Sequence, residues 1–259
     1  MPGTAKLRRP GYGEKLGWAW GVTMALLYAP FSLLIRIRYR HLDRLPQSGP
    51  VIIVTNHVSH VDPFLVAKMV IDGARRPRFL AKDTIFDVPV VGWFMTKMGH
   101  IPVKRGTSDA RQSFAAAVES LRRGGMIVLH PEGTVTRDPE GWPMTGKTGA
   151  ARLWMLAPDT PVVPVAQWGV QEQINLYTKT VKLVPRPRHV LSVGAPIDLS
   201  AFRGRQPDAH TLREITDVIV RRLRSDVAEL RGLPAPTGEL YRWVRPVESA
   251  SDDARRDSA

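Results

Sequence analysis

Residues 51–63 read VIIVTNHVSHVDP and decide how the rest of the chain is interpreted. Val51–Thr55 is a β-branched run after a Pro-Gln-Ser-Gly-Pro turn, which is typical of a buried strand. Asp62 and Pro63 favour a helix start, because aspartate is a good cap and proline suits the first helical position. The stretch therefore predicts a strand, a polar loop and a helix, as expected in an α/β domain.

Strands and helices alternate along the rest of the chain. This pattern predicts one α/β domain over residues 41–232, with a mostly parallel or mixed central sheet flanked by helices. Further strands are predicted at 79–81, 100–103, 126–130, 161–168, 181–184 and 190–194. Helices are predicted at 62–69, 88–98, 108–123, 148–156 and 208–230. Residues 233–259 are rich in proline, serine and aspartate, so we expect a flexible tail.

Residues 1–40 predict a membrane-associated helical segment. Residues 16–35 carry no charge, and that length could span a bilayer. Basic clusters lie on both sides, a proline interrupts the helical pattern, and the aromatic residues suit the headgroup region. We therefore expect one or two embedded or interfacial helices, with Arg36, Arg38 and Arg40 binding lipid phosphates. The alternative is a buried core helix. A cleaved signal peptide is not expected, because no small-x-small cleavage site follows.

The charge balance narrows the classes of partner. The chain has 37 lysines and arginines against 24 acidic residues, a formal net charge of +13, which attracts polyanions. Eight of the basic residues and two of the acidic ones fall within residues 1–45, around the apolar segment. This favours an anionic membrane surface, and we expect a monotopic or peripheral protein at the cytoplasmic face of the cell membrane. A basic nucleic-acid-binding protein is the alternative from another class, but the chain has no motif for it.

The loop after the first strand carries a candidate acid–base pair. Ligand sites in open α/β sheets form beyond the carboxyl ends of the strands. The neutral imidazole of His57 could take a proton from a hydroxyl, and a carboxylate on the other ring nitrogen would fix its tautomer. Asp62 could supply that carboxylate, or it could be only a helix cap. His60 is a second candidate for the base, and either histidine could be an ordinary loop residue. The chain has no cysteine, which excludes disulfides and a cysteine nucleophile.

Four short motifs together resemble a known family. Residues 56–62 match the N-H-x-S-x-x-D motif of the glycerolipid acyltransferases, and the chain resembles the bacterial 1-acyl-sn-glycerol-3-phosphate acyltransferases among them. Three further family motifs follow in the same order, at 101–105 (IPVKR), 131–134 (PEGT) and 162–165 (VVPV). Four motifs in order are far more specific than one. The resemblance implies transfer of a fatty acyl group from acyl-CoA or an acyl carrier protein thioester to lysophosphatidic acid, giving phosphatidic acid. It implies no metal and no other cofactor.

The resemblance also assigns roles to individual residues. It makes His57 the general base and Asp62 its orienting partner. Arg105 would bind the acceptor phosphate, for which a guanidinium offers planar paired donors. The residues that would contact the substrates are Asn56, Ser59, Arg105, Glu132, Gly133, Thr134 and Lys147.

The chain departs from the family pattern at two positions. Val135 stands where the family commonly has an arginine, and Arg137 is the candidate replacement. His130 stands at the aromatic position before Pro-Glu-Gly, which would change the polarity of the pocket. The motifs describe a base and a phosphate site, so they leave glycerol-3-phosphate, another lysophospholipid or a glycolipid open as the acceptor.

Overall fold

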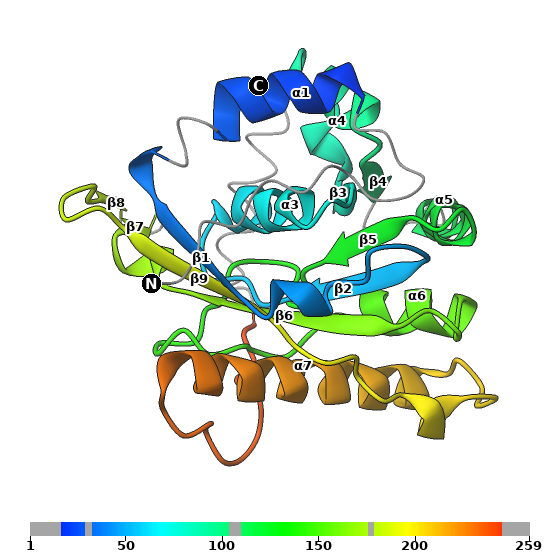
Figure 1. The fold of residues 1–259 in the computed structure, drawn as a ribbon. Helices are drawn as coiled ribbons and strands as arrows, with labels where there is room; N and C mark the ends of the chain where they lie inside the picture. Colours follow the sequence, from blue (N-terminus) through cyan, green and yellow to red (C-terminus); the bar gives the residue numbers. More distant parts are fainter. Residues whose placement is uncertain (1–16, 29–32, 104–109, 176–178, 245–259) are drawn as a thin grey trace.

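A seven-stranded sheet in the order β1-β9-β6-β2-β5-β3-β4 forms the centre of the fold (Figure 1). The computed structural model describes residues 17–28, 33–103, 110–175 and 179–244. Neighbouring strands are parallel except for β6 and β9, so the prediction of a mostly parallel or mixed sheet is confirmed. The strands of this sheet are β1 (Arg36–Arg40), β2 (Val51–Thr55), β3 (Pro77–Lys82), β4 (Ile101–Val103), β5 (Met126–Leu129), β6 (Val162–Trp168) and β9 (Arg188–Val193). A separate hairpin pairs β7 (Ile174–Asn175) with β8 (Thr180–Val181).

Helices cover both faces of the sheet (Figure 1). Val51 and Ile53 of β2 belong to the apolar cluster on the α3 face, while Ile52 and Val54 belong to the cluster under α6 and α7. This alternation explains why the whole strand is apolar, because both of its faces are buried. The helices are α1 (Trp18–Thr23), α3 (Asp62–Asp72), α4 (Val91–Lys97), α5 (Ala110–Arg122), α6 (Gly149–Leu156) and α7 (Ala209–Arg231). Short turns are the π-helix η1 (Met24–Tyr28) and the 3₁₀ helices η2 (Leu42–Arg44), η3 (Asp83–Ile85), η4 (Val170–Glu172) and η5 (Ser200–Phe202).

The long helix α7 follows the pattern expected at 208–230. The side chain of Asp208 caps its start by accepting a hydrogen bond of 2.7 Å from the Thr211 amide. Gly232 ends the helix in the left-handed conformation, with φ of 65°. The stripe that includes Leu212, Ile219 and Leu223 is fully buried against the sheet.

The N-terminal part differs from the helical segment expected over residues 1–40. Residues 36–40 form β1, an edge strand parallel to β9, and Tyr39 donates a hydrogen bond of 2.7 Å to Asp72. In α1, Trp20 is buried whereas Trp18 is 61% exposed, so this helix has one face on the domain and one in solvent. No helix within the described ranges is long and apolar enough to cross a membrane. Residues 1–16 and 29–32, which include much of the expected segment, lie outside the described residues.

In the described part of the C-terminal tail, residues 233–244, most residues are exposed and a few contacts join the segment to the domain, so the expected flexible tail stays a prediction. Thr145 donates its backbone N–H to the carbonyl of Tyr241 at 2.9 Å. Arg224 of α7 donates to the carbonyl of Gly238 at 3.0 Å, and Leu240 is buried. These contacts tie the tail to α7 and to the loop that follows β5.

Candidate active site

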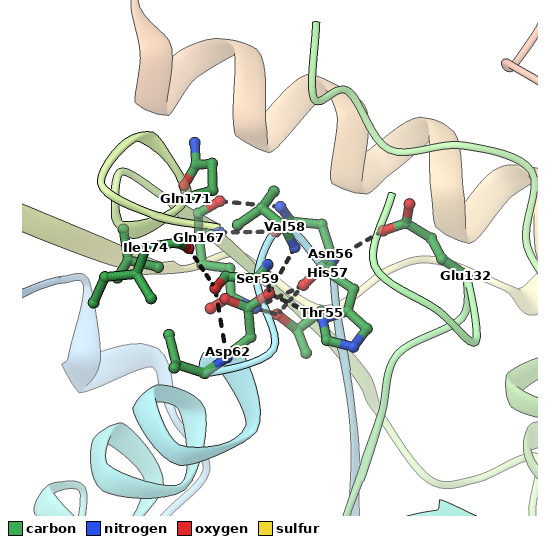
Figure 2. A network of polar contacts seen from close by, with 12 residues as sticks. Thr55, Asn56, His57, Val58, Ser59, Asp62, Glu132, Gln167, Gln171 and Ile174 are labelled. Carbon is green, nitrogen blue, oxygen red and sulfur yellow. Dashed lines mark hydrogen bonds and ion pairs between the residues drawn. The ribbon is translucent and has the colours of Figure 1, made fainter. Parts of the chain in front are cut away.

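His57 and Asp62 meet at the carboxyl end of β2 (Figure 2). Nδ1 of His57 lies 3.0 Å from Oδ2 of Asp62, which also accepts hydrogen bonds from the backbone amides of Val58 (2.6 Å) and Ser59 (2.8 Å). The loop therefore curls around one carboxylate oxygen. Because Nδ1 is bonded to the carboxylate, Nε2 of His57 is left as the acceptor for a proton.

Asp62 is not a side-chain cap for α3, although it is the first residue of that helix. No side-chain hydrogen bond caps this helix, and the carboxylate turns back to the preceding loop instead. Asp62 is fully buried, and burial raises the pKa of its carboxyl, whereas the hydrogen bonds from His57 and the two amides oppose that rise. His57, rather than His60, is therefore the histidine that the carboxylate orients.

The loop after β5 holds the backbone of His57. β5 is the parallel neighbour of β2, so both loops leave the sheet at the same edge. Oε1 of Glu132 accepts a hydrogen bond of 2.9 Å from the His57 amide, and Oε2 accepts one of 3.1 Å from the Met144 amide. The Thr136 amide donates to the His57 carbonyl at 2.7 Å. Both backbone polar groups of His57 are therefore bonded to this loop.

Glu132 is a buried residue rather than an open substrate contact. Its side chain is 2% exposed, and burial raises its pKa to about 8. Both carboxylate oxygens are occupied by backbone amides. We therefore revise its expected contact with substrate to a role in holding the loop.

Asn56 and Ser59 are likewise fully occupied within the protein. The side-chain amide of Asn56 donates through Nδ2 to the backbone carbonyl of Gln167 at 3.0 Å, and its Oδ1 accepts from the backbone N–H of Gln167 at 2.8 Å. The Ser59 hydroxyl donates to the carbonyl of Ile174 at 3.1 Å. Both side chains are buried and neither is among the described residues that line the cavity. Their expected contact with substrate becomes, in this geometry, a role in shaping the loop.

Sequence reasoning missed a supporting network behind Asn56. The buried Gln167 side chain donates to the Asn56 carbonyl at 2.7 Å and to the Thr55 hydroxyl at 3.2 Å. Its own oxygen lies 3.2 Å from Nε2 of His189, whose Nδ1 accepts from the Val170 amide at 3.2 Å. Because Nδ1 accepts, Nε2 carries the proton. Gln167 lies two residues after the fourth family motif, but its contacts depend on the order of β6 and β9 in the sheet.

A cavity of about 960 Å³ opens beside the imidazole of His57. Its walls come from α1, β3 and α4 and are largely apolar, which suits a hydrocarbon chain. Representative wall residues are Trp20, Leu26, Phe79, Val91, Phe94 and Met98. The exposed Lys147 and Arg152 lie at the same cavity, next to the start of α6. Arg152 was not singled out from the sequence.

Gly133 and Lys147, both expected to contact substrate, lie together at the cavity. Gly133 has a φ of 71°, and a Cβ added there would be 3.0 Å from Cδ of Lys147. Glycine is thus favoured both by the backbone and by the lysine that passes over it. Thr134 is half-buried and is not among the described cavity-lining residues.

The two arginine candidates are not equivalent. Arg105 lies outside the described residues, although β4 ends at Val103, which lines the cavity. The guanidinium of Arg137 lies 5.2 Å from the ring centroid of Trp243 in the C-terminal tail. Arg137 is not among the described residues that line the cavity.

His130 lies directly against the candidate base. The ring centroids of His130 and His57 are 4.3 Å apart, and Phe79 stacks on His130 at 6.3 Å. Burial, followed by the proximity of His57, lowers the pKa of His130 well below its usual range. It therefore acts as a neutral ring next to His57.

Comparison with known proteins shows the family of this chain. The model of the family named Acyltransferase matches residues 36–168, just over half of the chain. The chain belongs to the Acyltransferase family. The match begins with β1 and ends with β6, so it covers the cavity edge of the sheet.

Several curated members of this family are similar in sequence. The chain is 30% identical over 167 residues to a chloroplastic 1-acyl-sn-glycerol-3-phosphate acyltransferase of Arabidopsis thaliana, covering 59% of this chain and 45% of the relative. It is 36% identical over 88 residues to a lyso-ornithine lipid O-acyltransferase of Pseudomonas aeruginosa, covering 34% and 32%. The chain thus spans less than half the length of either relative.

A solved structure in the family has the same fold. The crystal structure of the 1-acyl-sn-glycerophosphate acyltransferase of Thermotoga maritima matches with a TM-score of 0.57. The two chains are 22% identical, over 84% of this chain and 78% of the other. The similarity supports the α/β architecture of this acyltransferase family member.

Proposed function

We propose that the chain transfers a fatty acyl group from an acyl thioester to the hydroxyl of 1-acylglycerol-3-phosphate, making phosphatidic acid for phospholipid biosynthesis. The observation that carries the proposal is the pair of His57 and Asp62 beside a large apolar cavity. An oriented base next to a site for a hydrocarbon chain is what this transfer requires.

His57 is the general base in this mechanism. Its Nε2 takes the proton of the acceptor hydroxyl while the hydroxyl oxygen attacks the carbonyl carbon of the thioester. The carboxylate of Asp62 stabilises the imidazolium that forms. The tetrahedral intermediate then collapses, the carbon–sulfur bond breaks, and the leaving thiolate recovers the proton from the imidazolium. The products are the new ester and a free thiol, and no metal or further cofactor takes part.

Basic side chains at the cavity bind the acceptor phosphate in this proposal. Lys147 and Arg152 both lie at the cavity and are exposed, so their charges can reach a phosphate without costly desolvation. Arg105, two residues after the end of β4, is the further phosphate ligand that the family resemblance suggests.

We propose that the protein works at an anionic membrane surface, as a monotopic or peripheral protein at the cytoplasmic face. Apolar side chains around the cavity are exposed on η1 and before α4, including Leu26 and Val90, each 69% exposed. Trp18 and Trp93 pack together at 5.3 Å between ring centroids, and both remain about half exposed or more. A surface of this kind would let a lipid acceptor and an acyl chain enter the cavity from the bilayer.

A second acceptor is a lyso-ornithine lipid, because relatives from two bacteria carry that name. The chemistry at His57 would be the same, and only the headgroup contacts would change. The alternative acceptors left open by the sequence, such as glycerol-3-phosphate, belong to the same test.

The test is acyl transfer with the purified protein on anionic phospholipid vesicles. Palmitoyl-CoA and palmitoyl acyl carrier protein are each offered with lysophosphatidic acid, glycerol-3-phosphate, a lyso-ornithine lipid or no acceptor. Thiol release and the lipid product are both followed, for the wild type and His57→Ala. We expect phosphatidic acid to form only with lysophosphatidic acid present, and the variant to be inactive. Absence of product with every donor and acceptor would contradict the proposal.

A further inference from the structure

The end of α7 grips the long loop between β5 and α6. The guanidinium of Arg231 lies between two indole rings, 4.0 Å from the centroid of Trp142 in the loop and 4.1 Å from that of Trp168 at the end of β6. Arg231 also donates a hydrogen bond of 3.1 Å to the carbonyl of Glu140. A planar cation fits between two aromatic faces in a way that a rounded ammonium does not. Arg231 therefore fastens the loop to β6 and α7 at one point.

The loop between β5 and α6 is connected to the backbone of His57 by two short chains of hydrogen bonds. The Thr136 hydroxyl donates to the Trp142 carbonyl at 2.7 Å, and the Thr136 amide donates to the His57 carbonyl at 2.7 Å. The Met144 amide donates to Glu132, which in turn accepts from the His57 amide. A displacement of residues 137–146 would thus be transmitted to both backbone groups of His57.

The second ring that Arg231 contacts, Trp168, is next to a residue that binds Asn56, the neighbour of His57. Trp168 directly follows Gln167 on β6, and Gln167 bonds to both sides of Asn56. Arg231 therefore contacts both the loop that holds the backbone of His57 and the strand that holds Asn56, the residue before it.

The C-terminal tail covers the loop from a third direction (orange to red in Figure 1). The Thr145 amide donates to Tyr241, and Arg137 lies over the ring of Trp243. Arg231, Tyr241 and Trp243, which contact the loop here, all lie beyond the part of the chain that the family model matches.

We propose that Arg231 is a positioning residue for the acyl transfer, which fixes residues 137–146 and, through them, the backbone of His57. The inference rests on the function proposed above. Arg231 is not among the described residues that line the cavity, so its loss should lower the turnover number without changing how well either substrate binds.

The first test compares Arg231→Ala and Arg231→Lys with Arg205→Ala. Arg205 is a matched control, because its guanidinium lies over Phe202 and pairs with Glu214 near the start of α7 instead. We expect kcat to fall about tenfold or more in both Arg231 variants, since small misplacement of a catalytic group is costly. KM for donor and acceptor should stay within about twofold, and the control should keep wild-type kcat. Wild-type kcat in Arg231→Ala would overturn the proposal.

A double-mutant cycle tests the route. Thr136→Val removes the hydroxyl that links Trp142 to the His57 contact. If Arg231 acts through this loop, the double variant should lose little more than the more damaged single variant. Fully additive losses would contradict the route.

Amide hydrogen exchange tests the same inference without substrate. Residues 136–144 and the His57 amide should exchange faster in Arg231→Ala than in wild type or Arg205→Ala. Unchanged exchange there would overturn the inference even in an active enzyme. Absence of acyl transfer by the wild type would instead sink the proposed function, and the exchange result would still decide whether Arg231 holds the loop.

Discussion

The sharpest prediction concerns Asp62→Asn, which removes the charge beside His57 with almost no change in shape. The amide oxygen can replace Oδ2 and keep the bonds from the Val58 and Ser59 amides. The amide nitrogen then replaces Oδ1, which is buried and has no hydrogen-bond partner among the described residues. An unsatisfied buried donor costs about 1–3 kcal/mol in the free energy of unfolding, so the variant should fold with reduced stability.

The effect on catalysis follows from the distance between the two groups. Nδ1 and Oδ2 are 3.0 Å apart. Because the charges of the imidazolium and the carboxylate are each delocalised, their centres are about 4 Å apart, and unit charges at that separation interact by about 4 kcal/mol at an effective dielectric constant of about 20. Each 1.36 kcal/mol is a factor of about ten, so losing the carboxylate charge should lower kcat by about a thousandfold. That magnitude lies within the usual range of about 10² to 10⁴ for general acid–base catalysis.

The assay is thiol release at saturating donor and acceptor, alongside unfolding in urea. Asp72→Asn is the matched control, because Asp72 lies on the same helix and bonds to Tyr39 and Lys68 through Oδ2. Its Oδ1 is likewise buried without a hydrogen-bond partner in the described part of the chain. We expect both variants to lose stability and only Asp62→Asn to lose turnover. A kcat within about threefold of wild type in the folded Asp62→Asn variant would refute the role given to this carboxylate.

Three further predictions test the shell around the base. Above about pH 8, where Glu132 is ionised and both of its oxygens accept from backbone N–H groups, Glu132→Gln should cost about 1–3 kcal/mol in urea unfolding and lower kcat, because one acceptor becomes a donor. The exposed Glu119→Gln should change neither, and equal stability of the two variants would contradict the buried role. Gly133→Ala should raise KM for the acceptor, because the new Cβ meets the lysine above it, while Gly204→Ala has the same backbone strain (φ of 76°) in open space and should affect stability alone. Burial lowers the pKa of His189 to about 3, so the unfolded chain binds the extra proton and stability falls as the pH drops from about 6.5 toward 3; compared with His189→Gln, wild type should lose up to about 1.4 kcal/mol more per pH unit in urea titrations. Parallel titration curves would show that His189 does not contribute.

Part of this arrangement could be predicted because it depends only on local pattern and on strand direction. The apolar run of β2 and the polar loop after it define one edge of the sheet, and a parallel β5 brings Glu132 to the same edge. The position of α7 could be predicted because its apolar stripe and its Asp208 cap both depend on local sequence.

Other parts could not be predicted because they depend on which segments become neighbours. Residues 36–40 look like the basic end of a membrane segment, yet pairing with β9 makes them a strand. The link from Gln167 to His189 exists only because β6 and β9 are adjacent and antiparallel. The tail residues 233–244 have the composition of a flexible segment, and that composition does not show that Arg224 bonds to this segment or that Leu240 is buried. Composition does not encode such partners.

The motif Pro-Glu-Gly-Thr, residues 131–134, has a different role in the structure from the one expected from its sequence. The sequence of this motif resembles a substrate-binding turn. In the structure, however, the two carboxylate oxygens of Glu132 accept hydrogen bonds from the backbone amides of His57 and Met144. The Thr136 amide binds the His57 carbonyl from the same loop, so the backbone of the base has no freedom to tilt independently of it. With Nδ1 fixed by Asp62 as well, only Nε2 of His57 is left to react. The two motifs therefore meet at the backbone of His57, and a change at Glu132 should appear first as a loss of turnover rather than of substrate binding.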